Sequence, residues 1–356
     1  MSFQIDQIAQ YCEEAALHGV TELALTEHSH RFVDVASVVG PFWLRHGHEP
    51  TSTTMAEYWA FHARNSLEEY VALAQRAKDE GLPVKIGLEV DFYQDQMDDV
   101  SALLAQYPFD VLIGSVHWLG TWQLDDIDNE VNMHQWVVRD VDECWTNYGR
   151  ALDELCATNA VDVLAHPDLI KVAGFFASNP AEVWDAMADS AARVDISMEC
   201  SSAGWKKPVK EQYPAEGFLD RLVDKGLTFT TASDAHRLER VGERADDLAA
   251  MLEALERDGA QGQTFAGAIC ERYGLASGAF ELDAARPAGP GFARGEFLAA
   301  HVDLIAATDR ATLDAVTNRM HDLLHAFDLQ ATEIKSYHTS LDGKYVPRQP
   351  VRFDAI

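Results

Sequence analysis

Histidine and acidic residues recur along the sequence as far as His236, and each group follows a short apolar run. The runs lead into Glu27-His28, Glu89, His117, His166, Glu199 and Asp234-Ala235-His236. Imidazole nitrogen together with carboxylate oxygen suits first-row divalent ions such as Zn, Mn or Fe. A carboxylate can also bridge two ions, an arrangement that hydrolyses phosphate esters. The sequence therefore predicts a metal site whose candidate ligands are His28, Glu89, His117, His166, Asp234 and His236.

Each of these residues also has a simpler explanation when it is taken alone. A single histidine at a strand end is more often a hydrogen-bonded polar residue than a metal ligand. Asp168 and Ser233 suit the N-caps of following helices, and Glu199 suits an ion pair with a lysine at the rim. The same chemistry after all six predicted strands favours a metal site. The helical pair His321 and His325 is assigned to the surface.

The elements that must position these residues are strands alternating with helices. This alternation predicts a parallel α/β fold, either a barrel or an open doubly wound sheet, and periodicity does not distinguish the two. In a parallel barrel the carboxyl ends of the strands meet on one face, where the candidate ligands would converge. No glycine-rich phosphate loop follows a strand, which argues against a nucleotide-binding sheet. The predicted strands are Glu22–Thr26, Val84–Val90, Asp110–Gly114, Val161–Ala165, Val194–Glu199 and Leu227–Thr231.

Composition excludes several classes of function. The 28 Lys+Arg against 58 Asp+Glu give a formal charge of −30, which disfavours long nucleic acid and anionic membranes as partners. A small phosphorylated substrate is still compatible, because it experiences only the local field of its pocket. The five cysteines include no Cys-x-x-Cys pair, and the sequence shows neither a membrane span nor a secretory signal. We therefore expect a cytoplasmic protein.

The chain changes character near Asp258. The predicted organisation is a metal-dependent phosphoesterase domain at residues 1–257, a linker at 258–291 and a small C-terminal α/β extension at 292–356. The linker contains the sequence Arg286-Pro287-Ala288-Gly289-Pro290-Gly291. The extension is predicted to hold a helix near Asp309–Phe327 and a hairpin around Asp342-Gly343.

Six motifs together resemble the PHP (polymerase and histidinol phosphatase) family, and most closely its histidinol-phosphate phosphatases of histidine biosynthesis. They are TEHSHRF, IGLEVDF, IGSVHWL, LAHPDLIK, CSSAGWKKP…YP and TTASDAH, which occur in this order, and the resemblance covers about residues 3–257. The resemblance implies a distorted (β/α)7 barrel with up to three metal ions at its carboxyl face. It also implies that Glu89 bridges two metals, that His117 and His166 complete one, and that Asp234 serves another. His28 and His236 would bind the third, and Glu89, His117, His166 and Asp234 would form the catalytic set.

Two features depart from the family pattern. The family's first strand, with its His-x-His motif, has no counterpart before Gly19. We expect the coding DNA upstream of Met1 to encode it, and a barrel without it would expose a strand edge.

The substrate loop reads Ser201-Ser202-Ala203-Gly204-Trp205-Lys206-Lys207 where the family has Asn-Thr-x-Gly-x-Arg-Lys. A lysine in place of that arginine exchanges a bidentate fork for a point charge. Arg31, Lys206 and Lys207 are the candidate phosphate-binding residues.

The favoured function is metal-dependent hydrolysis of a small phosphomonoester, with histidinol phosphate converted to histidinol. One alternative is a related phosphoesterase that acts on nucleotides or short oligonucleotides. The other is a non-catalytic relative that retains a metal site. A preference for diesters would favour the first alternative, and a restored N-terminus that still lacked His-x-His would favour the second.

Overall fold

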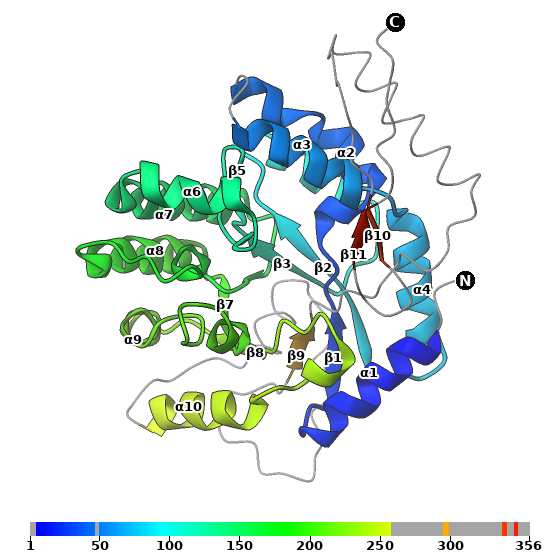
Figure 1. Ribbon diagram of the computed structural model, residues 1–356. Helices are drawn as coiled ribbons and strands as arrows, with labels where there is room; N and C mark the ends of the chain where they lie inside the picture. Colours follow the sequence, from blue (N-terminus) through cyan, green and yellow to red (C-terminus); the bar gives the residue numbers. More distant parts are fainter. Residues whose placement is uncertain (1–4, 47–49, 258–294, 299–336, 340–344, 348–356) are drawn as a thin grey trace, which may run out of the picture.

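The computed structural model describes residues 5–46, 50–257, 295–298, 337–339 and 345–347. Parallel strands form a ring at its centre, and helices cover the outside of the ring (Figure 1). The predicted parallel α/β barrel is therefore confirmed. The ring contains, in order, β1 (Glu22–Leu25), β2 (Val84–Asp91), β3 (Val111–Ser115), β6 (Val163–Leu164), β7 (Ser197–Ser201), β8 (Phe229–Ala232) and β9 (Gly295–Leu298).

The strand β9 closes the ring between β8 and β1. Leu23 of β1 is in register with Val84 of β2 on one side and with Glu296 of β9 on the other. Glu296 is also in register with Thr231 of β8, and all these pairings are parallel. The prediction of an exposed strand edge beside β1 is therefore wrong, because β9, from the C-terminal part of the chain, pairs with β1. The predicted linker at 258–291 and the predicted helix near Asp309–Phe327 lie outside the described residues.

The helices pack around the ring, and α7 to α10 follow one another along one side of it (Figure 1). Two starts agree with sequence signals: the Ser66 side chain accepts a hydrogen bond from the Glu69 amide at 3.3 Å, and Pro180 begins α8. The helices are α1 (Ile5–Leu17), α2 (Val33–Val39), α3 (Pro50–His62), α4 (Leu67–Asp79), α5 (Met97–Leu104), α6 (Glu130–Val138), α7 (Val141–Thr158), α8 (Pro180–Val194), α9 (Glu216–Asp224) and α10 (Ala245–Arg257).

Three helices lie where the sequence shows no clear helical pattern. α2 and α3 lie between residues 33 and 62, and α6 lies between the third and fourth strands of the ring. The buried residues of α3 are Thr51, Ser52, Met55 and Trp59, so polar side chains interrupt its apolar face. Such a face lacks the apolar repeat by which an amphipathic helix is found in a sequence.

Among the described residues, two short hairpins lie outside the ring. β4 (Trp118–Leu119) pairs with β5 (Trp122–Gln123) directly after the third strand. β10 (Tyr337–Thr339) pairs antiparallel with β11 (Tyr345–Pro347), which agrees with the hairpin predicted around Asp342-Gly343. None of the described helices is both long and apolar enough to cross a membrane.

Close packing of β1 against β2 fixes the backbone just before the first acidic candidate ligand. A Cβ atom at Gly87 would stand 2.7 Å from the Leu25 carbonyl oxygen and 2.9 Å from a methyl of Thr26. Only glycine fits at this point, two residues before Glu89. The packing therefore holds the end of β2 beside the segment that carries His28, whose backbone forms an isolated parallel bridge with Glu89.

Candidate metal centre

The Glu89 carboxylate at the end of β2 is shared by three histidines. Its Oε1 atom lies 3.1 Å from His166 Nε2 and 3.4 Å from His117 Nε2, and its Oε2 atom lies 3.3 Å from His28 Nδ1. Glu89 is 1% exposed. The three histidines come from chain segments that follow three different strands, β1, β3 and β6. The structure therefore brings together four of the six predicted ligands.

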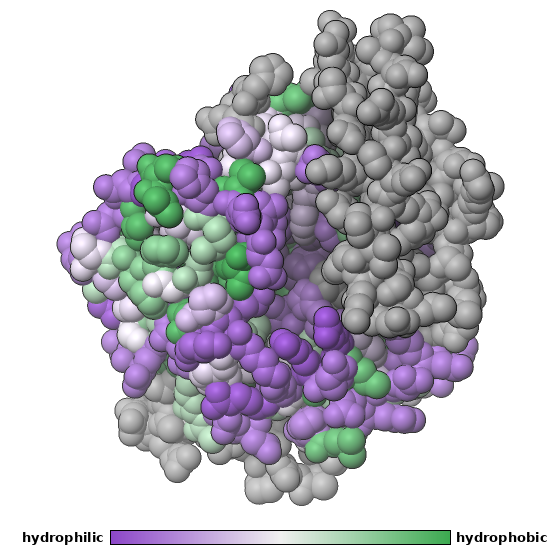
Figure 2. Space-filling view, viewed as in Figure 1, coloured by the Kyte–Doolittle hydropathy of each residue, from purple (hydrophilic) through white to green (hydrophobic). Residues whose placement is uncertain are grey.

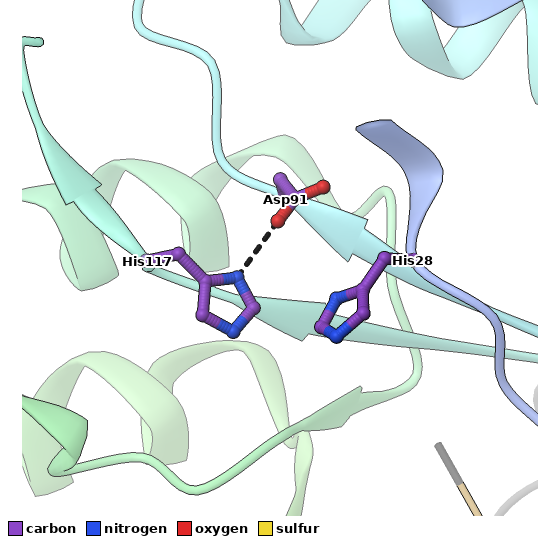
Figure 3. A group of neighbouring side chains, drawn as sticks. All are labelled: His28, Asp91 and His117. Carbon is purple, nitrogen blue, oxygen red and sulfur yellow. Dashed lines mark hydrogen bonds and ion pairs between the residues drawn. The ribbon is translucent and has the colours of Figure 1, made fainter. Parts of the chain in front are cut away.

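A second group joins His28 and His117 to Asp91 (Figure 3). Asp91 Oδ1 lies 2.7 Å from His117 Nδ1, while Asp91 Oδ2 accepts from the Ser29 and Tyr93 hydroxyls at 2.7 and 3.1 Å. Since Asp91 is a carboxylate, His117 Nδ1 donates a proton to it, and Nε2, on the Glu89 side, is the nitrogen that a metal ion would bind. A carboxylate behind a histidine in this way fixes its ring and its tautomer for metal binding.

Asp91 and His30 are the site residues that the sequence analysis missed. Asp91 follows Glu89 by two residues on the same strand, and residues two apart project from the same face, so this spacing could have identified it. His30 Nδ1 lies 3.1 Å from Asp91 Oδ2, and its Nε2 lies 2.8 Å from the Tyr58 hydroxyl. His30 thereby connects α3 to the Asp91 carboxylate.

Burial and charge act together on the titration of this cluster. Burial alone would lower the pKa of His117, but the charges of Asp125, Glu89 and Asp91 and the Asp91 hydrogen bond raise it to about 10. Burial would raise the pKa of Asp91, but His30 and His117 hold it well below its usual range. The cluster therefore keeps a carboxylate and a proton-holding imidazole in contact when no metal is present.

Glu199 is part of the same buried region. Its Oε1 atom accepts a hydrogen bond from the His166 amide at 3.1 Å. Burial and the charges of Asp234 and Glu89 raise the pKa of Glu199 to about 8, although His166 opposes this. The alternative of a lysine partner at the rim is wrong, because Glu199 is buried behind His166.

The last two predicted ligands, Asp234 and His236, lie beside each other, and His236 is near His28. The rings of His28 and His236 are 5.9 Å apart between centroids, and His236 Nδ1 is 3.5 Å from Asp234 Oδ1. Asp234 has φ 48° and His166 has φ 27°, so two candidate ligands occupy the left-handed region that non-glycine residues rarely adopt. Backbone strain of this kind gathers at functional sites. Asp168, which the sequence suggested as the N-cap of a following helix, makes no cap hydrogen bond and pairs instead with Lys171.

Two of the three predicted phosphate-binding residues form ion pairs within the protein. Arg31 is 4% exposed, and its Nε lies 3.5 Å from Glu27 Oε1. Lys206 forms an ion pair with Glu243, and its side chain is 46% exposed, while Lys207 is half-buried. Figure 2 shows hydrophilic residues around a hollow near the centre of its view.

The donor set fits a first-row divalent metal. Two groups of side chains, His28 with Asp91 and His117, and Glu89 with His117 and His166, each place their ligand atoms within 4.8 Å of one another. Imidazoles and carboxylates are the ligands that Zn, Mn and Fe accept, and a carboxylate between histidines can serve two ions.

The sequence and the fold are similar to those of known proteins. Residues 4–203 match the family model described as the PHP domain. A Deinococcus radiodurans protein named "probable histidinol-phosphatase" is 32% identical over 184 residues, which cover 51% of this chain and 69% of that protein. A Schizosaccharomyces pombe protein of the same name is 23% identical over 192 residues, covering 50% of this chain and 62% of that protein.

Among solved structures, a Listeria monocytogenes protein assigned as a histidinol phosphatase has a similar fold. Its TM-score is 0.53 at 16% identity, and the match covers 66% of this chain and 92% of that one. The family match extends over more than half of the sequence and contains Glu89, His117 and His166. The chain belongs to the PHP domain family.

Proposed function

We propose that the protein is a metal-dependent phosphatase that hydrolyses histidinol phosphate to histidinol. The observation that carries the proposal is the buried Glu89 carboxylate, which three histidines from separate strand ends approach within 3.4 Å. The names of the two curated relatives support histidinol phosphate as the substrate. The formal charge of −30 is compatible with this substrate, because a small phosphorylated molecule experiences only the local field of its pocket.

The roles of the residues follow from their positions. Glu89 and the histidines at 28, 117 and 166 would hold divalent metal ions, with Asp234 and His236 completing the set. Asp91 orients His117 by accepting its Nδ1 proton at 2.7 Å. When bound, the ions supply Lewis-acid stabilisation of charge on the phosphoryl oxygens and lower the pKa of water.

Phosphate recognition is assigned to the basic residues near the site. Lys206 and Lys207 lie on the loop after β7, where Lys206 is exposed enough to exchange its partner Glu243 for a substrate. Arg31 is held by Glu27 and follows His28 by three residues. We assign Arg31 a supporting positive charge beside the metal centre.

The test is phosphate release from a substrate panel. The purified chain, loaded with Mn or Zn, is assayed on L-histidinol phosphate, p-nitrophenyl phosphate and bis-p-nitrophenyl phosphate. We expect the highest kcat/KM for L-histidinol phosphate and little turnover of the diester. His166→Asn should abolish activity, whereas His134→Asn, a change on the exposed surface of α6, should not. A preference for the diester would overturn the proposal in favour of a phosphodiesterase.

A further inference from the structure

The loop between β7 and α9 (residues 202–215, hereafter the β7–α9 loop) is fastened to the barrel at its far end. Ser201 and Tyr213 exchange two backbone hydrogen bonds of 2.7 and 3.0 Å. The Ala215 amide donates to Asp168 Oδ2 at 2.8 Å. The part of the loop around Tyr213 is therefore fixed next to the carboxyl end of β7.

A buried lysine joins this loop to the turn that follows His166. Lys171 is 0% exposed, and its Nζ lies 3.0 Å from Asp168 Oδ2, 2.8 Å from Glu211 Oε1 and 2.7 Å from the Gln212 carbonyl oxygen. The same ammonium lies 5.2 Å from the centre of the Tyr213 ring. Because Asp168 and Lys171 follow the candidate ligand His166 in one turn, the lysine couples the position of Tyr213 to that of His166.

Tyr213 carries a polar group that the protein itself does not satisfy. The residue is 1% exposed, and its hydroxyl is buried without a hydrogen bond to the described part of the chain. Its ring centroid is 6.1 Å from that of His166. Buried tyrosine hydroxyls normally have a partner.

Other buried tyrosines follow that rule. The Tyr70 hydroxyl donates to the Leu25 carbonyl at 2.8 Å, and the Tyr93 hydroxyl donates to Asp91 at 3.1 Å. The Tyr148 hydroxyl has a hydrogen bond with the backbone of Leu169. Tyr213 differs from these three, although it lies in the same acidic surroundings as Tyr148.

We propose that the Tyr213 hydroxyl donates a hydrogen bond to a phosphoryl oxygen of the bound substrate, and that Lys171 holds the ring in place. The inference rests on the proposed phosphatase function and adds a substrate-binding residue to it. Burial, together with the charges of Asp168, Asp234 and Asp125, raises the pKa of Tyr213 well above its usual value, so the phenol stays protonated. A neutral donor suits this position, because it can bind an anionic oxygen without forming an ion pair with the surrounding carboxylates.

The test uses Tyr213→Phe in the metal-loaded full-length chain, a change that removes only the hydroxyl. We expect kcat/KM for L-histidinol phosphate to fall about tenfold or more, the effect of losing one hydrogen bond to a charged group. The inhibition constant of inorganic phosphate should rise by a similar factor. Metal content should match the parent, and Tm should be equal or higher, because removing a buried unpaired hydroxyl does not destabilise the fold.

Tyr148→Phe is the matched control, since its hydroxyl already has a partner in the protein. We expect it to lower Tm while leaving kcat/KM and phosphate inhibition within about twofold of the parent. If Tyr213→Phe keeps the parent's kcat/KM and phosphate inhibition, or acts only by losing metal, the inference is wrong and the phosphatase proposal stands. If the parent releases no phosphate from any monoester, the proposed function itself is wrong.

Discussion

Glu89 provides the negative charge on which the candidate metal centre depends. Replacing it with Gln keeps the shape but removes the charge between His28, His117 and His166. We expect Glu89→Gln to lose most of its bound metal and activity together, because an amide is a poor ligand for these ions. Elemental analysis and phosphate release on the same samples measure both quantities.

The matched control for this change is Glu80→Gln, at an exposed ion pair with Arg76. Exposed pairs of this kind contribute little to stability, so metal content and activity should equal those of the parent. Unchanged metal in Glu89→Gln would show that the ions bind elsewhere.

Lys206 is expected to contribute less to activity than Glu89, and to do so through substrate binding. Because Glu243 already pairs with it and its side chain is half exposed, Lys206→Ala should raise KM for a phosphomonoester by no more than about fivefold, with kcat nearly unchanged. Steady-state kinetics at low and high salt measure this, since screening should weaken the parent more than the variant. Identical salt dependence in the two proteins would show that Lys206 does not bind the substrate.

Residue types and spacing were sufficient to find Glu89 and its three histidines, because every strand ended in the same chemistry. They were insufficient for His30, and for Asp91 they indicate only that it shares a face of β2 with Glu89, because the roles of both depend on hydrogen bonds between segments that the sequence does not place. Asp91 gains its role from His117, 26 positions along the chain. The unpaired Tyr213 hydroxyl likewise could not be predicted from the sequence, since a missing hydrogen-bond partner is visible only in three dimensions.

At the scale of elements, the buried Lys171 should be a stability determinant of the β7–α9 loop. Lys171→Met leaves Asp168 and Glu211 close together without their cation, and we expect a loss of about 3–5 kcal/mol in the free energy of unfolding. Urea denaturation followed by tryptophan fluorescence measures it. Lys225→Met, which breaks an exposed pair with Asp189, should change the free energy of unfolding by less than about 1 kcal/mol. Equal effects of the two substitutions would contradict the assignment.

The strands were predictable as elements because both of their faces are buried, which produces short apolar runs. The helix α3 was not, since Thr51 and Ser52 lie on its buried side. The pairing of β9 with β1 and β8 could not be predicted either, because more than two hundred residues separate β9 from β1 and no local pattern encodes such a contact.

At the scale of the whole molecule, the metal-free protein should lose stability as pH rises. His117, with a pKa of about 10, and Glu199, with a pKa of about 8, hold protons in the folded state that the unfolded chain releases nearer 6.5 and 4.5. The folded state therefore binds more protons between pH 6.5 and 8, where both groups act, and its stability falls across that interval. Tm of chelator-treated protein at several pH values measures the slope.

Glu199→Gln is the control for this prediction, because a glutamine does not titrate. Its metal-free form should show a smaller decrease of Tm between pH 6.5 and 8 than the parent. A slope equal to that of the parent would contradict the assignment of Glu199 as a buried proton-holding group.

The most direct test of a metal-dependent phosphatase is reconstitution of the stripped protein. The full-length chain is freed of metal with a chelator and titrated with Zn or Mn, and bound metal and phosphate release from L-histidinol phosphate are measured in the same samples. We expect no turnover without metal, activity that rises in proportion to bound metal, and no recovery in His166→Asn. Turnover by the stripped protein, or full metal binding without phosphate release, would show that the protein is not a metal-dependent phosphatase.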